Sequence, residues 1–247
     1  MDHVKEMAKV FESYRYKHGV HRVFEDFLEI ATITISNTVD LPNWQRREER
    51  YMEIIKQYDR DEADTFAKLI AKLTNAMQYK IDDYLGRVFM ELELYDSFKG
   101  QFFTPISVAS LMAKLTAVDA AELIAKKGFI RVNEPAAGGG VTLLAFINEL
   151  QTMGCNPQQT VQVFAQDLDK KAVHMTYIQL SLLGINLTIT HGDTLTQEVW
   201  DTWRSPGYFF RWGYGAGRKN TEKFAEEELE KVENLITENQ SEQLVLL

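Results

Sequence analysis

The sequence predicts an α/β protein in which a parallel sheet follows an α-helical N-terminal region. Two observations carry this prediction. Between residues 128 and 193, three short apolar runs are each followed within two residues by an acidic residue, and helical patterns separate them. Over residues 1–98, apolar side chains instead recur at steps of three and four, which is the spacing of one helix face. We therefore expect an α-helical domain over residues 1–98 and an α/β core over residues 99–213.

The N-terminal region is expected to contain four or more amphipathic helices. A first helix covers residues 4–14, a second covers residues 23–35, and a charged helix runs from Pro42 to about residue 57. Residues 61–94 continue the helical pattern with a break near Lys80, Gly86 or Glu93. The aromatic residues of this region fit a hydrophobic core, and no catalytic pattern is present in it.

A glycine turn follows the first apolar run of the core. Residues 128–132 are expected to form a strand that ends at Glu134, and Gly138 to Gly140 then lead into a helix over residues 141–153. An acid before such a turn is how α/β proteins build a nucleotide-type pocket, with the positive helix N-terminus facing the ligand. Glycine turns also join strands to helices for packing alone, and that alternative stays open.

Two further acids are expected on the same rim. The second apolar run ends at Asp167, a helix is predicted over residues 170–183, and a third strand over residues 187–191 leads to Asp193. Ligands bind outside the carboxyl ends of parallel strands, where a carboxylate can take both hydroxyls of a ribose. The alternative is that these acids cap the following helices.

Upstream of the glycine turn, residues 100–105 read Gly-Gln-Phe-Phe-Thr-Pro, and a helix over residues 107–126 lies between the two motifs. This order resembles the adenine-N6 DNA methyltransferases, in particular the modification subunits of type I restriction-modification systems. Those proteins carry Gly-x-Phe/Tyr-Phe/Tyr-Thr-Pro before an Asp-Pro-Ala-Cys-Gly-Ser-Gly-like turn. The resemblance covers residues 100–213 and implies a Rossmann-like core that binds S-adenosylmethionine. It also allows a helical N-terminal domain that contributes to assembly and DNA contact.

The resemblance implies a set of cofactor contacts. The Thr-Pro segment and the aromatic residue before it would flank the methionine end of S-adenosylmethionine, and the glycine turn would lie under that end. The acid of the second strand would take the ribose, and the acid after the third would bond the adenine amine of the cofactor. The implied residues are Phe103, Thr104, Pro105, Glu134, Ala136, Gly138, Asp167 and Asp193.

A catalytic tetrapeptide is also implied by the resemblance. Related enzymes carry Asn/Asp/Ser-Pro-Pro-Tyr/Phe after the fourth strand, where polar acceptors align the target amine and the aromatic ring stacks on the flipped base. Here the corresponding residues are Ser205, Pro206, Gly207 and Tyr208, with glycine in place of the second proline. The resemblance assigns catalysis to Ser205, Pro206 and Tyr208. Because Pro-Gly is a common turn pair, a plain turn is the alternative.

After Tyr208 the pattern of buried strands stops. Residues 209–220 are rich in glycine and aromatic residues, and residues 221–247 form an acidic helical pattern. We therefore expect a shortened parallel sheet of three or four strands, with residues 214–247 as a glycine-rich linker and acidic helical tail. The tail is interpreted either as a partner helix or as a solvated segment. No target-recognition module is evident, so sequence specificity would come from another chain.

The charge distribution argues against strong DNA binding by the chain alone. Residues 221–247 hold eight Glu and two Lys, which is −6 of the formal net charge of −9 and leaves −3 for residues 1–220. Phosphate neutralisation normally supplies much of the affinity for DNA. A local basic patch with interleaved aromatics fits stacking on an extruded base, or equally a half-buried loop. Its cations are Arg204, Arg211, Arg218 and Lys219.

No apolar run approaches the ~20 residues of a membrane span, and residues 1–6 lack a signal-peptide core, so a cytoplasmic location without membrane association is expected. The single cysteine, Cys155, has no disulfide partner, and the five scattered His residues predict no metal site.

The resemblance implies methyl transfer from S-adenosylmethionine to the N6 amine of adenine in DNA, without a covalent enzyme intermediate. Expected partners are DNA and a specificity or restriction subunit, or a second copy of the chain. One alternative is a non-catalytic relative that binds DNA or a restriction complex. Another is a methylase of RNA, protein or a small molecule.

Overall fold

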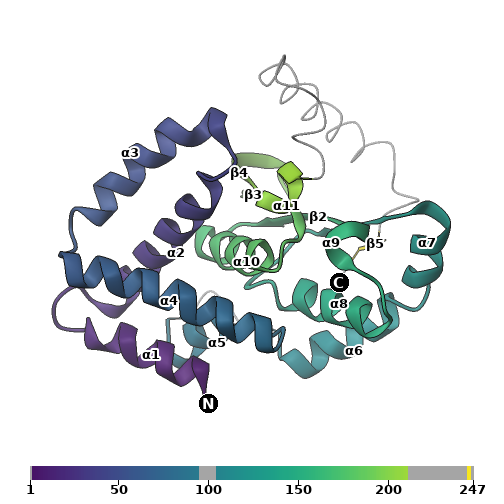
Figure 1. The fold of residues 1–247 in the computed structure, drawn as a ribbon, viewed down its shortest axis with the longest axis horizontal. Coiled ribbons are helices and arrows are strands. Elements are labelled where there is room, and N and C mark those ends of the chain that lie inside the picture. Colours follow the sequence, from purple (N-terminus) through teal and green to yellow (C-terminus); the bar gives the residue numbers. More distant parts are fainter. Residues whose placement is uncertain (1, 95–103, 211–243, 246–247) are drawn as a thin grey trace.

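The computed structural model describes residues 2–94, 104–210 and 244–245, and it begins with a layer of helices (Figure 1). These helices follow the predicted amphipathic segments, and the break predicted near Lys80 lies between α4 and α5. They are α1 (His3–Ser13), α2 (Val20–Ser36), the short 3₁₀ helix η1 (Leu41–Asn43), α3 (Trp44–Ile55), α4 (Arg60–Tyr79) and α5 (Tyr84–Glu91).

Capping residues explain where α4 and α5 begin. Asp59 and Glu62 form a reciprocal capping box at the start of α4, which satisfies backbone N–H groups that have no partner within the helix. Asp83 caps α5 by accepting a hydrogen bond from Gly86 N. The start of α5 therefore depends on a buried carboxylate that is 4% exposed.

A five-stranded sheet forms the second layer, in the order β4-β3-β2-β1-β5. β1, β2, β3 and β5 run parallel, and β4 runs antiparallel to β3. The strands are β1 (Ile130–Glu134), β2 (Val161–Asp167), β3 (Asn186–Asp193), β4 (Glu198–Arg204) and β5 (Leu244–Val245). The helices of this part are α6 (Ile106–Thr116), α7 (Ala120–Lys127), α8 (Val141–Thr152), α9 (Pro157–Thr160), α10 (Lys170–Leu182) and α11 (Pro206–Tyr208).

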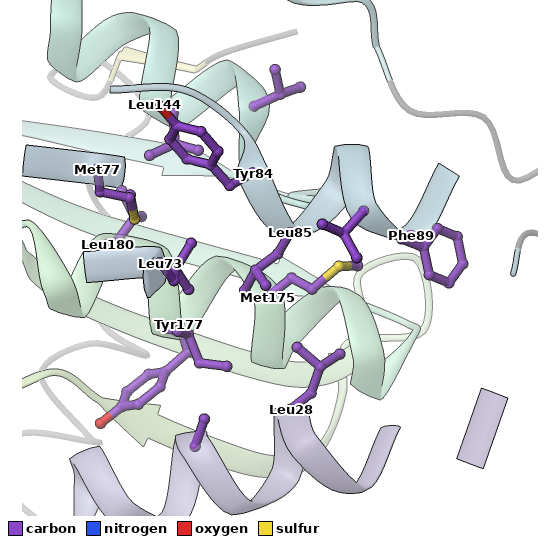
Figure 2. Close-up of a cluster of buried hydrophobic side chains, with 14 of the residues drawn as sticks. Leu28, Leu73, Met77, Tyr84, Leu85, Phe89, Leu144, Met175, Tyr177 and Leu180 are labelled. Atoms are coloured by element: carbon purple, nitrogen blue, oxygen red, sulfur yellow. The ribbon is translucent and has the colours of Figure 1, made fainter. Parts of the chain in front are cut away.

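Helix α10 connects the two layers, since it packs on β2 and β3 and also against α2, α4 and α5. Figure 2 shows Leu28 of α2 and Leu73 of α4 on the side of Met175 of α10, with Leu85 of α5 beside Met175. All of these side chains belong to one buried cluster that extends from α1 to the sheet. Because α10 is buried on nearly every side, Thr176 and Gln179 form hydrogen bonds within the protein, to Gly138 O and Gly139 O.

The α/β class with a helical N-terminal region is confirmed, and three details of the prediction are wrong. The single helix expected over residues 107–126 is two helices, α6 and α7, separated by a turn at residues 117–119. The fourth strand, β4, is not parallel, because Gln197 at φ +62° completes a reverse turn that makes β3 and β4 a hairpin. Leu244 and Val245, expected in a helical tail, pair with β1 as strand β5.

The interpretation of residues 214–243 as a linker and acidic helix lies outside the described residues, and the boundaries of the predicted domains stay a prediction. Among the helices of the described ranges, none combines the length and the apolar character needed to cross a bilayer.

Candidate functional site

The glycine turn after β1 is packed tightly against α10. Gly138 and Gly140 adopt φ of +54° and +91°, a region that favours glycine. A Cβ atom on Gly140 would lie 2.9 Å from Thr176 Oγ1, and that hydroxyl donates a 2.9 Å hydrogen bond to Gly138 O. The turn therefore approaches α10 more closely than a side chain would permit, and it directs the chain into α8.

Glu134 ends β1 beneath this turn and is 4% exposed. Its Oε2 accepts a 2.8 Å hydrogen bond from Thr142 Oγ1, and its Oε1 accepts a 3.3 Å hydrogen bond from Ala136 N. Burial raises the pKa of Glu134, an effect that these two donors partly oppose. The acid thus holds the two sides of the turn together as well as lying at the predicted pocket.

Asp167 ends β2 and contacts the same turn. Its Oδ2 accepts a 2.7 Å hydrogen bond from Gly138 N, and its Oδ1 accepts a 2.8 Å hydrogen bond from Asp169 N. Burial raises the pKa of Asp167. A carboxylate has about four acceptor positions, so each oxygen retains a lone pair for a ligand hydroxyl. The neighbouring Leu168 is 61% exposed, which leaves an apolar side chain at the rim beside Asp167.

Asp193 completes the rim at the end of β3. Its Oδ1 accepts hydrogen bonds from the backbone of Leu195 at 2.8 Å and Thr196 at 3.3 Å, so it closes a turn and does not cap a helix. Thr194 Oγ1 donates a 2.7 Å hydrogen bond to Pro135 O, which joins this turn to the segment after β1. The structure therefore brings the three predicted acids to one edge of the sheet.

A cavity of about 430 Å³ lies where the N-terminal helices meet this edge. Thr104 and Pro105, which precede α6, line it together with Val141 at the start of α8. The opposite wall comes from α1 and α5 and includes Asp83 and Arg87. Phe103, predicted beside the same cofactor end, lies outside the described residues.

Gln179 of α10 was not predicted as a site residue, yet it connects the glycine turn to α5. Its Nε2 donates 2.9 Å hydrogen bonds to Gly139 O and to Asp83 Oδ1, and its Oε1 accepts a hydrogen bond from Leu85 N at 3.2 Å. The side chain is fully buried. A lone amide in the apolar pattern of residues 172–180 was the available signal, but its partners lie more than 30 residues away in sequence.

The predicted catalytic tetrapeptide lies at the edge of the sheet opposite to Glu134 and Asp167. Because β4 is antiparallel, it carries the chain back to the amino end of β3, where Ser205 N bonds to Leu187 O. The six residue steps from Leu187 to Asp193 correspond to about 20 Å of strand. Ser205, Pro206 and Tyr208 therefore do not contact a base held at the edge of Glu134 and Asp167.

The surroundings of Ser205 explain this placement. Its hydroxyl is fully buried, donates a 2.6 Å hydrogen bond to Ile185 O and accepts a 3.0 Å hydrogen bond from Leu187 N. A Cβ atom on Gly207 would lie 2.6 Å from Ile185 O, which accounts for glycine where the related motif has a second proline. The segment thus fastens β4 to the start of β3.

The aromatic and basic residues before residue 211 are largely structural. Trp203 is buried beneath Arg47 of α3, whose guanidinium carbon lies 3.9 Å from the ring centroid. Arg204 lies 5.3 Å from the ring centroid of Tyr208, which is 9% exposed. This favours the half-buried alternative for these residues. Arg211, Arg218 and Lys219 lie outside the described residues.

The position beside β1 on the side away from β2 is held by β5. Val245 pairs with Asn133 in parallel register, so the carboxyl end of β5 faces the same edge as Glu134. Over the described residues, no group of three or more His, Cys, Asp or Glu side chains is arranged to hold a metal ion.

Comparison with known proteins gives one sequence family. The profile of the N-6 DNA methylase family matches residues 83–209, which is half of the chain and spans the segment from Asp83 through the tetrapeptide. No curated protein sequence matches significantly.

Two solved structures resemble the fold. One, from Listeria monocytogenes, is assigned to the class I S-adenosylmethionine-dependent methyltransferases; it shares 18% identity at a TM-score of 0.38 and covers 81% of this chain and 56% of its own. The other is the methyltransferase subunit of a type I restriction-modification system from Streptococcus thermophilus, with 14% identity, a TM-score of 0.37, and coverage of 81% and 59%. The chain therefore spans little more than half the length of either protein.

Proposed function

The chain belongs to the N-6 DNA methylase family, and from that premise we propose that it binds S-adenosylmethionine and transfers its methyl group to the N6 amine of adenine in DNA. The observation that carries the proposal is the hydrogen bond from Gly138 N to Asp167, which joins the glycine turn after β1 to the acid that ends β2. These are the two groups that a nucleoside cofactor contacts at the carboxyl edge of a parallel sheet.

The residues of this edge suit the parts of the cofactor. The remaining lone pairs of Asp167 accept hydrogen bonds from the ribose hydroxyls, and Leu168 covers one face of the adenine ring. Asp193 keeps Oδ2 for the adenine amine, since the hydrogen bonds from Leu195 N and Thr196 N use Oδ1. Thr104 and Pro105, with Phe103 before them, flank the methionine end in the cavity at the start of α8.

Bound S-adenosylmethionine supplies an electrophilic methyl group on sulfur. The protein then has to hold the adenine amine in line with that methyl group and accept hydrogen bonds from the amine as its nitrogen lone pair forms the new C–N bond. In such a transfer the electron pair of the broken S–C bond would stay on the departing thioether, and the methylated amine would lose a proton to water. The three acids hold the cofactor and take no part in bond making.

Acceptors for the amine are the missing part of the described site, because Ser205, Pro206 and Tyr208 lie at the other edge. We propose that the target base binds at the side of β1 that β5 occupies, because the carboxyl end of this parallel strand faces the same edge as Glu134. We further propose that DNA sequence is read by a partner, either a specificity or restriction subunit or a second copy of this chain.

The position of the tetrapeptide also favours a second candidate, a relative that binds cofactor and a DNA-bound complex without methylating DNA itself. Incubation with S-adenosylmethionine labelled in the methyl group, DNA and candidate partner subunits separates the two. Label recovered as N6-methyladenine, and lost with Asp167→Asn, supports the enzyme. Saturable cofactor binding with no label in DNA under any combination supports the second candidate.

A further inference from the structure

We propose that Asp83 binds the α-ammonium group of S-adenosylmethionine and thereby positions the methionine end of the cofactor. This inference rests on the proposed function, and it assigns a role to a residue of the N-terminal helices that neither the sequence motifs nor the family match assigns.

Asp83 is buried, and one of its two carboxylate oxygens is left for a ligand. Both hydrogen bonds to the side chain are accepted by Oδ1, from Gly86 N at 2.9 Å and from Gln179 Nε2 at 2.9 Å. Within the described ranges, no group donates a hydrogen bond to Oδ2. The residue is 4% exposed and lines the cavity of about 430 Å³ that also contains Thr104 and Pro105. An acceptor that faces a cavity can receive a hydrogen bond from a ligand bound there.

Two glycines, Gly86 of α5 and Gly139 of the glycine turn, allow Asp83 Oδ2 to lie close to that turn. A Cβ atom on Gly86 would lie 2.1 Å from Asp83 Oδ2, and one on Gly139 would lie 3.1 Å from the same oxygen. Gln179 donates to both Asp83 Oδ1 and Gly139 O, which fixes the carboxylate relative to the turn. Asp83 is thus held beside the glycine turn that is proposed to lie under the methionine end.

The nearby cations are paired with a different carboxylate, and of these Arg87 has only a minor effect on Asp83. Arg87 pairs with Asp82 at 2.9 Å, and Lys80 approaches the same carboxylate at 3.5 Å. Asp83 therefore has only neutral hydrogen-bond donors among the described residues. Burial raises the pKa of Asp83 to about 6, so it is mostly ionised at neutral pH but at a cost in free energy. A bound cation offsets that cost.

The α-ammonium group fits this requirement better than the sulfonium. An ammonium carries N–H donors that satisfy Oδ2, whereas a sulfonium carries a charge but no donor. The adjoining wall also suits the carboxylate of the amino acid, since Lys5 and Arg87 line the cavity and the positive N-terminus of α8 begins at Val141. The cavity thus presents opposite charges to the two ends of a zwitterion.

The test compares two ligands by calorimetric titration at pH 8. S-adenosylmethionine carries the amino-acid end, and 5′-methylthioadenosine lacks it but keeps the adenosine. The variants are Asp83→Asn and Asp83→Ser, both of which retain a capping side chain for α5. Asp59→Asn is the matched control, because Asp59 also caps a helix but lies at the far end of α4, about 30 Å of helix away.

Loss of a charge-assisted hydrogen bond predicts that Asp83→Asn and Asp83→Ser bind S-adenosylmethionine about 10- to 100-fold more weakly. Their affinity for 5′-methylthioadenosine stays within about twofold of wild type, and Asp59→Asn changes neither affinity. Equal binding of S-adenosylmethionine by wild type and a folded Asp83 variant overturns this inference and leaves the proposed function intact. An equal loss of both ligands also overturns it, since it indicates a general disturbance of the pocket. Failure of both ligands to bind the wild-type protein overturns the proposed function as well.

Discussion

Replacement of Gly140 by alanine tests whether the glycine turn depends on its contact with α10. The backbone at φ +91° disfavours an alanine by about 1–2 kcal/mol. The new Cβ atom would also lie 2.9 Å from Thr176 Oγ1 and 3.4 Å from Thr176 Cα and Cβ. That hydroxyl is held by its bond to Gly138 O, so relief requires a shift of α10 or of the turn. Overpacking of this kind adds about 1–3 kcal/mol, which gives a total of about 2–5 kcal/mol.

Gly154→Ala is the matched control, because Gly154 has φ +81° but no atom within 4 Å of the added Cβ. Urea unfolding of both variants should show a loss of about 1–2 kcal/mol for Gly154→Ala and a clearly larger loss for Gly140→Ala. Thr176→Ala in the Gly140→Ala background should recover part of the difference in a double-mutant cycle. Equal losses for the two glycine variants, with no coupling to Thr176, would refute the close approach of the turn to α10.

Three further predictions concern other parts of the fold. Burial of His174 lowers its pKa to about 3, so the unfolded state takes up the proton first as the pH drops. The free energy of unfolding of the wild type therefore falls below pH 6.5. Between pH 7 and pH 5, His174→Gln should lose about 2 kcal/mol less of this free energy than the wild type, measured by urea unfolding at both pH values. Arg47 forms a buried ion pair with Asp40, so Arg47→Met should cost about 3–5 kcal/mol of stability by leaving the carboxylate unpaired. The double variant Arg47→Met with Asp40→Asn should recover much of that stability. No recovery would mean that the unpaired carboxylate is not the cause of the loss. Ser205→Ala should cost about 1–3 kcal/mol of stability because it leaves Leu187 N without an acceptor. Its affinity for S-adenosylmethionine should stay at the wild-type value. A loss of cofactor affinity without a loss of stability would mean that Ser205 belongs to the cofactor site.

The parts of the fold that local rules specify were predictable. The glycine turn, the acid at the end of each parallel strand and the amphipathic helices depend on residues close together in sequence, and the structure places Glu134, Asp167 and Asp193 at one edge as expected. The direction of β4 was not predictable in this way. Its turn has Gln197 at φ +62° in place of a glycine or asparagine, and its first three residues are exposed, so the sequence carries no hairpin signal.

The direction of β4 explains the position of the tetrapeptide. Ser205 to Tyr208 match the family pattern by residue type, but their role depends on which edge of the sheet they reach, and that is set by strand direction. The contact between Asp83 and Gln179 was not predicted from the sequence for a related reason. It joins residues 96 positions apart, so it exists only after α5 has packed on α10. Local pattern thus predicts the elements, while the contacts between distant elements complete the site.

The most direct test of the account is a calorimetric titration of S-adenosylmethionine into the wild-type protein and into Asp167→Asn. We predict saturable binding of one cofactor per chain for the wild type, and a loss of at least about tenfold in affinity for the variant, because the amide cannot accept from both ribose hydroxyls while holding Gly138 N. Absence of saturable binding to the wild type at about 1 mM cofactor, or equal affinity in the two proteins, would contradict the assignment of this edge as the cofactor site.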